Sequence, residues 1–472
     1  MGKFSADFEE RCCDLDRVLG AGRSYDVICR ALCIGGRRAK LWVIDGLGQD
    51  AVLDRITSVL LQVKNETMAQ VETAEDFAAR FVTFSEIDFC SAYAEAATGV
   101  FLGKTILVVE GLEKALTVDA KGYPGRSVEE PADSKVLRGA HDGFVETLVF
   151  NTALIRRRIR DTNLTMEAHQ LRGSSKTDVV LCYMENRVRR DILREVREKL
   201  EKIDLNSVTM AQESIAEAMM PPQWYNPFPK VRYTERPDAA AAAVMEGQIL
   251  LLVDNSPAVM ILPVSFFDFL EETNDYYFPP LVGTYLRWVR GIVFFLSLFI
   301  TPVWYLLVRN PEKLAEGWQF LAVQDEVAVP LLVQLFLVEF IVDVLKLASL
   351  NTPDTLGHSF SMLGALILGD FAVQARWLAS EVLVYMAFVA IANFVQPSYE
   401  LGYAIKLWRM GILIFAGIFG WWGFALGFVL GLVMLATTRP VAGKWYLYPL
   451  FPFHGKELSH LLLRHPSNRN NT

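Results

Sequence analysis

The sequence GIVFFLSLFITPVWYLLV, residues 291 to 308, decides the architecture of this chain. It carries no charge, and arginines flank it at Arg287, Arg290 and Arg309. An apolar run of roughly 18–20 residues matches the ~30 Å hydrocarbon core of a bilayer. A helix of a soluble protein keeps a polar face, which this segment lacks. We therefore expect residues 291–308 to span a membrane.

The chain changes character at about residue 280, from charged and turn-rich to mostly apolar. A second uncharged run extends from Gly411 to Thr437, and three less uniform apolar segments cover Val327–Leu350, Leu356–Ala375 and Leu378–Phe394. These segments predict an α-helical transmembrane bundle behind a soluble head. Five full spans would place the basic C-terminus outside, so we expect one partial segment. Residues 356–375 suit that role, because their glycines and polar residues fit backbone that lines a cavity.

The net charge of −8 lies almost entirely on the head. This acidity argues against a general nucleic-acid-binding surface. The N-terminus has no apolar signal region, so we expect a cytoplasmic head. Basic residues flank the membrane ends that we place inside, which predicts that both termini are cytoplasmic. These residues are Arg287, Arg290, Arg439, Lys444 and Lys456.

The head contains one α/β pattern twice. A strand over Lys40–Asp45 precedes the amphipathic run Ala51–Val63, and a strand over Asp178–Met184 precedes a helix over Arg187–Ile203. Each copy then closes with a small-residue helix, a glycine, a strand, a turn and a second strand. The closing elements are Ala92–Ala97, Gly103, Thr105–Glu110 and Ala115–Val118 in the first copy, and Ala239–Met245, Gly247, Ile249–Asp254 and Ala258–Val264 in the second.

This pattern predicts the domain organisation and fold class. We expect an α/β soluble head of two similar small α/β subdomains, followed by a C-terminal α-helical transmembrane bundle. The expected boundaries are 1–120 for subdomain 1, 121–137 for a turn-rich linker, 138–280 for subdomain 2, 281–440 for the transmembrane domain and 441–472 for a cytoplasmic tail.

Two local sequence patterns resemble a phosphate-binding loop and a metal site, but neither has the features that such a site requires. Gly99–Thr105 resembles a phosphate-binding loop, but it is one residue short and runs from helix to strand, so we expect a turn. Cys29 and Cys33 stand at helical spacing with no histidine nearby, so we expect reduced thiols and no metal site.

Two polar segments of the head have structural alternatives. Arg156 to Arg160 would close a helix that starts near Asp142, as a solvated end or as a contact with another subunit or with the membrane surface. Residues 226–238 would form a proline-stiffened connector in which Asp238 caps the next helix.

The membrane half contains charged residues that need partners or water. Glu339, Asp343 and Lys346 fall on one helix face, and Asp370 lies four residues before Gln374. Ionised groups in hydrocarbon cost several kcal/mol, so they face the bundle interior, a watery path or one another. One alternative is a salt-bridged packing stripe of Glu339 or Asp343 with Lys346. The other is a water-filled conduction path. Small residues such as Gly364 and Gly369 would allow close helix approach.

Ordered sequence signatures extend over residues 135–401. They are Arg138, Gly139, Gly143, Phe144, Val145 and Glu146; Asn151, Leu154, Ile155, Arg156, Arg157, Arg158 and Ile159; Ser175, Lys176, Thr177, Asp178 and Val179; Pro227, Phe228 and Pro229; Thr234, Glu235, Arg236, Pro237 and Asp238; Glu246 and Gly247; and Pro397, Ser398, Tyr399, Glu400 and Leu401. These signatures resemble those of a known family, the A subunits of spore germinant receptors, or GerA family. The chain departs from the family at Asp343, where a glutamate is common, and at Asp370, where the family usually has an uncharged residue.

The resemblance implies a multi-pass protein of the spore inner membrane that acts in germination. Family A subunits are thought to assemble as ring oligomers, expected to be pentamers, that form gated cation channels. The resemblance also implies a small membrane partner or other germination proteins, besides the lipid bilayer itself. It transfers no catalytic residue, cofactor or metal, and the sequence offers no catalytic set.

The leading interpretation is therefore a subunit of an oligomeric cation channel that promotes or amplifies ion release. The alternative is a non-conducting membrane scaffold for germination complexes. A secondary transporter is a third possibility, but it should repeat in its membrane half, whereas the repeat here lies in the head.

Overall fold

The computed structural model describes residues 2–122, 140–172, 177–203, 211–220, 223–272, 274–313, 321–323, 327–351, 372–443 and 445–463. The chain forms two compact units. The first, which we call the head, comprises Met1–Pro221, Val231–Val264 and Pro440–Gly443. The second, which we call the helical domain, comprises Pro222–Lys230, Ser265–Arg439 and Lys444–Thr472. The expected linker lies almost wholly outside the described residues.

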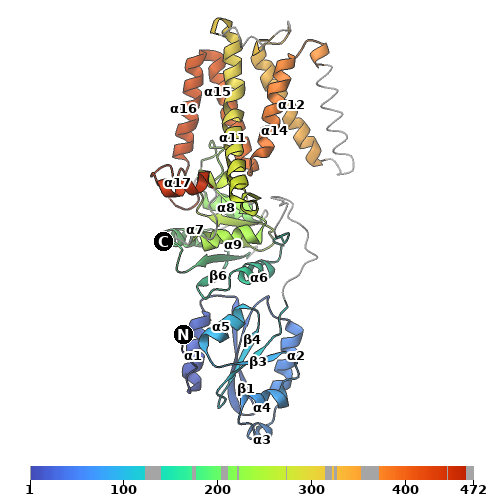
Figure 1. Ribbon diagram of the computed structural model, residues 1–472, viewed down its shortest axis with the longest axis vertical. Coiled ribbons are helices and arrows are strands. Elements are labelled where there is room, and N and C mark those ends of the chain that lie inside the picture. The colour runs from blue at the N-terminus through green and yellow to red at the C-terminus, as the bar shows by residue number, and fades with distance from the viewer. Residues whose placement is uncertain are drawn as a thin grey trace. The chain divides into compact units, whose positions relative to one another are not determined.

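The head is built from two copies of one module (Figure 1). The first copy consists of α1 (Phe8–Leu19), β1 (Val27–Ile34), β2 (Arg37–Ile44), α2 (Asp50–Leu61), α3 (Asn65–Met68), α4 (Ala74–Phe81), β3 (Ile87–Cys90), α5 (Tyr93–Phe101), β4 (Thr105–Val109) and β5 (Ala115–Val118). The second consists of α6 (Leu148–Arg158), β6 (Leu164–Gln170), β7 (Asp178–Met184), α7 (Arg190–Glu201), α8 (Ala211–Met219), β8 (Arg232–Thr234), α9 (Pro237–Met245), β9 (Ile249–Val253) and β10 (Val259–Leu262).

The two sheets have the same topology, which confirms the predicted duplication. The strand orders are β1-β2-β4-β5-β3 and β6-β7-β9-β10-β8, with antiparallel neighbours throughout. The turns correspond too: Gly103 and Gly247 have φ of 86° and 96°, and eight residues later Gly111 and Asn255 have φ of 83° and 62°. Because L residues rarely adopt positive φ, these matched positions show that the backbone follows the same path in both copies. Gly103 ends α5 before β4, so the segment resembling a phosphate loop is a turn, as expected.

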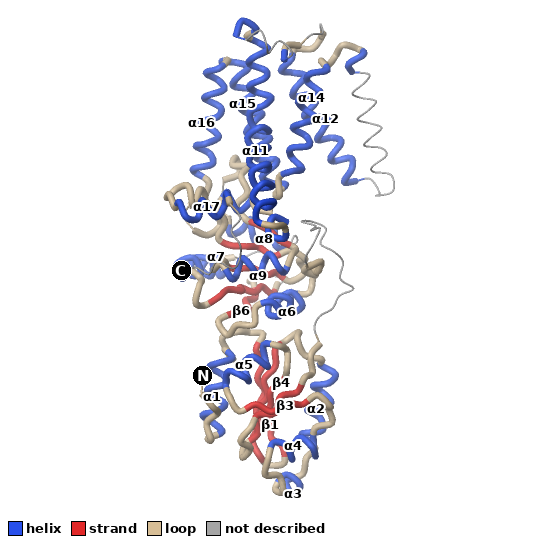
Figure 2. The backbone as a smooth tube through the Cα atoms, in the orientation of Figure 1, coloured by secondary structure: helices blue, strands red, loops and turns tan. Residues whose placement is uncertain are grey.

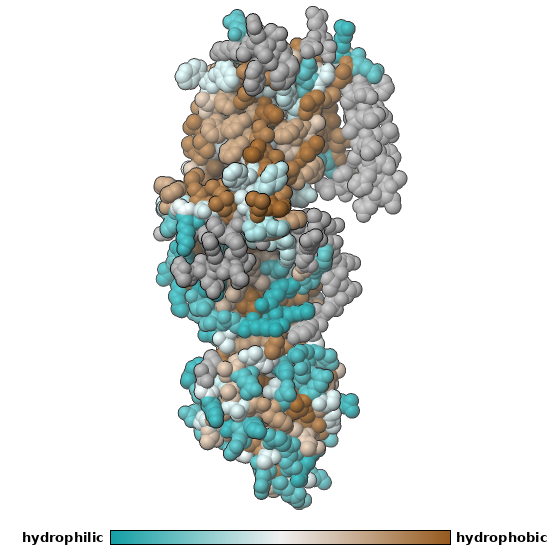
Figure 3. Space-filling model, in the orientation of Figure 1, coloured by the Kyte–Doolittle hydropathy of each residue, from teal (hydrophilic) through white to brown (hydrophobic). Residues whose placement is uncertain are grey.

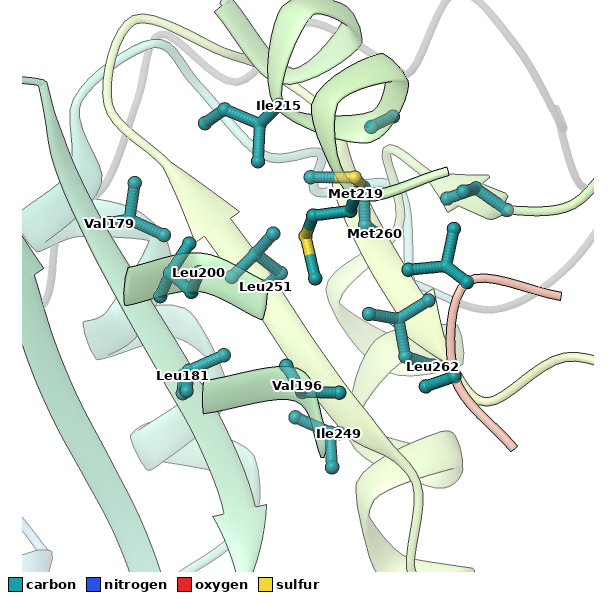
Figure 4. Packing of buried hydrophobic residues seen from close by; sticks show 14 of the residues in the cluster. Val179, Leu181, Val196, Leu200, Ile215, Met219, Ile249, Leu251, Met260 and Leu262 are labelled. Atoms are coloured by element: carbon teal, nitrogen blue, oxygen red, sulfur yellow. The ribbon is translucent and has the colours of Figure 1, made fainter. Parts of the chain in front are cut away.

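Each sheet carries helices on both faces, and strands β4, β5, β9 and β10 are buried on both sides. In the first copy, α1 and α5 cover one face, and α2 and α4 cover the other. In the second, α6 and α9 cover one face, and α7 and α8 cover the other. Figure 4 shows Val196 and Leu200 of α7 with Ile215 and Met219 of α8 against Leu181, Ile249 and Leu251 of the strands. Val441 and Ala442 join this core from far along the chain.

Helix α6 connects the two copies through its buried arginine. Arg156 is fully buried, and its Nε donates to Asp26 Oδ2 of the first copy at 2.8 Å. Its Nη2 donates to Asp26 Oδ1 at 3.1 Å and to Ser24 Oγ at 3.3 Å. Nearby, Ala153 of α6 belongs to the first copy's core. The expectation of a solvated or surface-binding helix end was therefore wrong for Arg156, because apolar side chains surround α6 on both sides.

Cys29 and Cys33, although at helical spacing in the sequence, lie on strand β1, where the same spacing puts both on one face of the strand. Two further local predictions were wrong. Helix α6 begins at Leu148, six residues after Asp142, although Arg158 does pair with Asp142 at 2.5 Å. Arg236 is the N-cap of α9, so Asp238 stands in its first turn, where it accepts from the Arg236 guanidinium.

The helical domain contains long apolar helices, shown in blue in Figure 2. Two of them, α11 and α15, are long and apolar enough to cross a membrane, and α14 and α16 are shorter apolar helices. The elements are η1 (Phe266–Phe269), α10 (Asn274–Tyr277), α11 (Pro280–Arg309), η2 (Pro311–Lys313), α12 (Leu331–Asn351), α14 (Ser380–Val395), α15 (Tyr399–Phe419), α16 (Trp421–Thr437) and α17 (Gly455–Leu462). Their outer surface is largely hydrophobic (Figure 3). The expected partial segment 356–375 lies mostly outside the described residues.

The uncharged run 411–437 is not one span, as the sequence had suggested, but the arms of a helical hairpin. Gly420 breaks it with φ of 61° and ψ of −136°, a conformation that only glycine adopts without strain. Three buried glycines of α16 then face α15: a Cβ on Gly423 would lie 1.8 Å from Phe415 O, and one on Gly427 2.9 Å from Ile412 Cα. The third is Gly431. Small residues at four-residue spacing let the two backbones approach closely.

Replacing Arg156 with methionine should destabilise the protein, because Asp26 would remain buried without its partner. Loss of one member of a buried pair costs about 3–5 kcal/mol. The neighbouring exposed Arg157→Met should change the unfolding free energy by less than about 0.5 kcal/mol. Denaturant unfolding followed by circular dichroism measures both, and equal effects would contradict a structural role for the pair.

The change Gly423→Ala should weaken the α15–α16 hairpin, since its methyl group would collide with a backbone carbonyl. Overpacking costs typically about 1–3 kcal/mol. Gly411→Ala is the matched control, because a Cβ there meets nothing within 4 Å and alanine favours a helix by about 1 kcal/mol. Thermal unfolding in detergent should separate the two, with Gly423→Ala melting lower and Gly411→Ala unchanged or higher.

Candidate functional site: a buried charge cluster in the helical domain

Four charged side chains meet between two helices of the helical domain. Glu339 and Asp343 come from α12, and Lys406 and Arg409 come from α15. Glu339, Lys406 and Arg409 are buried, whereas the Asp343 side chain is 32% exposed. Each pair stands at helical i,i+4 or i,i+3 spacing, so both members lie on the same face of their helix.

The cluster is a connected set of charge-assisted hydrogen bonds. Arg409 Nη2 donates to Glu339 Oε2 at 2.7 Å, and Lys406 Nζ lies 3.1 Å from Glu339 Oε1. Lys406 Nζ also donates to Asp343 Oδ2. Glu339 thus uses both oxygens on two cations, while Lys406 bridges the two carboxylates. Two negative and two positive charges leave these four side chains formally neutral.

A third helix completes the cluster. Arg409 Nη1 donates to the backbone carbonyl of Ser297 on α11 at 3.0 Å. Ser297 lies within the uncharged run 291–308, so the guanidinium is surrounded by α11, α12 and α15. Two polar atoms here have no hydrogen-bond partner within the described residues, Arg409 Nε and Asp343 Oδ1. Both oxygens of Glu339 are therefore paired, whereas Arg409 and Asp343 each keep one buried polar atom without a partner among the described residues.

Burial makes this neutrality energetically important. Removing a charge from water costs several kcal/mol per ion, and close pairing offsets that cost only where geometry is good. Deletion of one partner leaves an uncompensated charge in an apolar site. The cluster therefore holds α12 and α15 in one register, and it can carry functional charge only where a member reaches water.

The sequence predicted the acids but not their partners. It suggested pairing with Lys346 on the same helix, whereas the structure pairs Glu339 and Asp343 with Lys406 and Arg409 of α15. The sequence contained a signal for these partners: Lys406 and Arg409 lie three residues apart inside an apolar helix and need anionic neighbours. The Lys346 ammonium lies 4.9 Å from the ring centre of Phe394 and 5.7 Å from that of Tyr403.

The other predicted residues do not join this cluster. Gln374 is exposed, and Asp370, like Gly364 and Gly369, lies outside the described residues. Among the family-signature positions, Ser398 is the N-cap of α15 and accepts from Leu401 N at 3.3 Å. Arg236 is buried in the head and donates to the Ala140 carbonyl at 3.1 Å. Glu146 and Arg157 are exposed, and Arg138 and Gly139 lie outside the described residues.

Titratable groups of the head with shifted pKa values are explained by local structure. The Arg38 guanidinium donates to Glu110 and lowers the pKa of that carboxyl to about 2. Burial raises the pKa of the Cys182 thiol to about 12, which keeps it protonated. In the part of the chain that the structure describes, no three metal-ligating side chains converge on a metal site. The buried charge cluster of the helical domain is thus the strongest candidate for a functional site.

A duplicated α/β head joined to apolar helices with an internal charge cluster defines a class of membrane-associated protein. Comparisons with known proteins identify the family. The family described as "Bacillus/Clostridium GerA spore germination protein" matches residues 15–472. The chain therefore belongs to the GerA family, as its signatures had suggested.

Two relatives from Bacillus subtilis agree with this assignment, and one solved structure is also similar. Stage V sporulation protein AF of Bacillus subtilis is 35% identical over 96% of this chain and 94% of its own length. Spore germination protein KA of the same organism is 28% identical over 94% of this chain and 82% of its own. The N-terminal domain of the A subunit of the Bacillus megaterium germinant receptor GerK3 covers 56% of this chain and 98% of its own, at 24% identity and a TM-score of 0.43.

Because the relatives are spore germination and sporulation proteins, this chain is a membrane-associated protein of the germination system.

The change Glu339→Gln should destabilise the helical domain by about 3–5 kcal/mol, since Arg409 would stay buried without its partner. The change Arg409→Gln should have a similar effect, and the double variant should cost clearly less than the sum of the two. The exposed Glu312→Gln serves as the control. Thermal unfolding of the detergent-purified variants measures the coupling, and additive losses would show that the two side chains are not partners.

Proposed function

We propose that this chain is a subunit of an oligomeric cation channel, expected to be a pentamer, in the spore inner membrane. In this proposal it promotes or amplifies ion release during germination and has no enzymatic role or cofactor. The head is cytoplasmic and the helices cross the membrane several times. Membership of the GerA family supports a role in germination. The unequal exposure of Glu339 and Asp343 in the charge cluster supports ion conduction.

The proposed ion conduction rests on the difference in exposure between the two carboxylates of α12. Glu339 is buried and engages two cations. The Asp343 side chain, one turn further, is 32% exposed, while its Oδ1 is buried and has no hydrogen-bond partner among the described residues. A partly exposed carboxylate within an apolar helix requires a watery surrounding. Rings of such carboxylates around an axis favour cations and repel anions.

The surface of α12 supports assembly around such an axis. Phe340, Val344 and Leu347 are exposed and follow one face of the helix, with Asp343 at its margin. In a ring, this apolar face would pack on the neighbouring subunit, and Asp343 would lie where the interface meets the axis. Glu339 would then hold α12 against α15 within each subunit, while Asp343 would act on ions.

One observation favours a scaffold instead. The two carboxylates are matched in number by Lys406 and Arg409 of the same chain, so the cluster can serve packing alone. A scaffold would use the head to gather other germination proteins or a small membrane partner. Nucleic acid is not expected as a partner, because the head is acidic.

The two carboxylates can be tested separately. Asp343→Asn should leave accumulation and oligomer mass unchanged, because Glu339 still pairs with both buried cations and the amide oxygen can accept from Lys406. It should lower cation conductance relative to anion conductance. Glu339→Gln should reduce accumulation of the folded protein. Conductance of the purified assembly in planar bilayers, together with its mass in detergent, measures both. An assembly of normal mass without conductance would favour the scaffold, and unchanged selectivity in Asp343→Asn would remove this residue from the ion path.

A further inference from the structure

The segment after the last apolar helix is a folded part of the helical domain. Tyr446 is buried, and its hydroxyl donates to the Pro229 carbonyl at 2.6 Å. The Tyr446 carbonyl accepts from Phe266 N at 2.7 Å. These contacts fix one side of the segment to the interior, and so they determine which side chains point away.

The side chains that point away are large and apolar. Trp445, Phe451 and Phe453 are 51%, 60% and 70% exposed. Backbone hydrogen bonds hold the turn that presents them, from Phe451 N to Leu447 O at 3.0 Å and from His454 N to Pro449 O at 2.9 Å. A hydrogen-bonded turn that displays aromatic side chains is suited to a surrounding less polar than water.

Helix α17 shows at what depth this segment lies relative to α11. Arg287 Nη1 donates to the Leu461 carbonyl at 3.1 Å, and Trp288 Nε1 donates to the Leu462 carbonyl at 3.2 Å. Trp288 stands three residues before the apolar run that begins at Gly291. At 1.5 Å per residue, α17 ends about 5 Å outside the hydrocarbon core, at the level of the lipid headgroups.

A second segment reaches the same boundary from another helix. Asn226 Nδ2 donates to Thr438 Oγ1 at 2.8 Å, and Thr438 is the C-cap of α16, directly after its apolar run. Two residues before Asn226, Trp224 is 95% exposed and Tyr225 is also exposed. Exposed cations stand beside both segments, at Arg439 and Lys456.

We propose that Trp224, Tyr225, Trp445, Phe451 and Phe453 form an aromatic collar that is embedded in the lipid headgroup–acyl boundary of an anionic leaflet. Tryptophan and tyrosine favour this boundary because their rings are apolar and their polar atoms reach water. Arg439 and Lys456 add attraction to acidic lipid headgroups. The residues expected to form a cytoplasmic tail thus lie along the membrane up to Leu463. The collar rests on the proposed embedding of α11 and α16 in a bilayer.

Lipid photocrosslinking of the full-length protein in anionic nanodiscs tests the collar. One phospholipid probe carries its diazirine next to the glycerol, and the other carries it at the end of the acyl chain. Mass spectrometry should find adducts on residues 445–453 and 223–225 from the glycerol-proximal probe, with loss of these adducts for the chain-end probe. Adducts from both probes along α11 and α16 report the embedding of the helices independently.

A double variant, Phe451→Ser with Phe453→Ser, should lose the adducts on residues 445–453 and keep those on α11 and α16. The head variant Phe150→Ser changes an exposed aromatic residue outside the helical domain and should leave the collar adducts unchanged. Helices labelled by lipid with an unlabelled collar would overturn the inference while leaving the proposed function intact. Crosslinks from residues 445–453 to a second copy, in place of lipid, would show a subunit interface and overturn it as well. Unlabelled helices would overturn both proposals.

Discussion

The pairing of Glu339 with Arg409 is the interaction on which the helical domain depends. Both side chains are buried in apolar surroundings. There, an unpaired charge destabilises the fold by more than most contacts between helices stabilise it. The pair fixes the register of α12 against α15, and the Ser297 carbonyl adds α11 to the same point. Once these helices are fixed, the position of Asp343 at the margin of the cluster follows, because it lies one turn from Glu339 on the same face.

The head obeys the same constraint at a different place. Arg156 and Asp26 are buried at the joint between its two copies. Separating the copies would therefore break this ion pair and leave each charge without its partner. The similarity of the two copies does not depend on this joint, since their strand orders and positive-φ turns correspond independently of it. What distinguishes the copies is how they use their first helices: α6 contributes to both cores, whereas α1 belongs to the first copy alone.

The sequence predicted those features that repeat or that follow from composition alone. The strand, helix, glycine and strand pattern recurred at Gly103 and Gly247, so the duplicated module was visible. The partner of each buried charge was not, because Asp26 and Arg156 are separated by 130 residues and Glu339 and Arg409 by 70. The spacing of Cys29 and Cys33 fits a helix as well as a strand, so it could not place them on β1. Gly420 was invisible within an uncharged run, since hydropathy does not distinguish one long helix from a hairpin.

Little chain separates α16 from the head. Val441 is packed in the second copy's core, and Thr438, the C-cap of α16, stands three residues before it in the sequence. Within the helical domain, α16 packs on α15 through glycines whose replacement would bring atoms into collision. Lys406 and Arg409 of α15 hold the carboxylates of α12. Coupling between distant sites needs a contiguous network with discrete arrangements. The contacts from α16 through α15 to Asp343 are contiguous within the helical domain, because each helix is held to the next by close packing or by ion pairs.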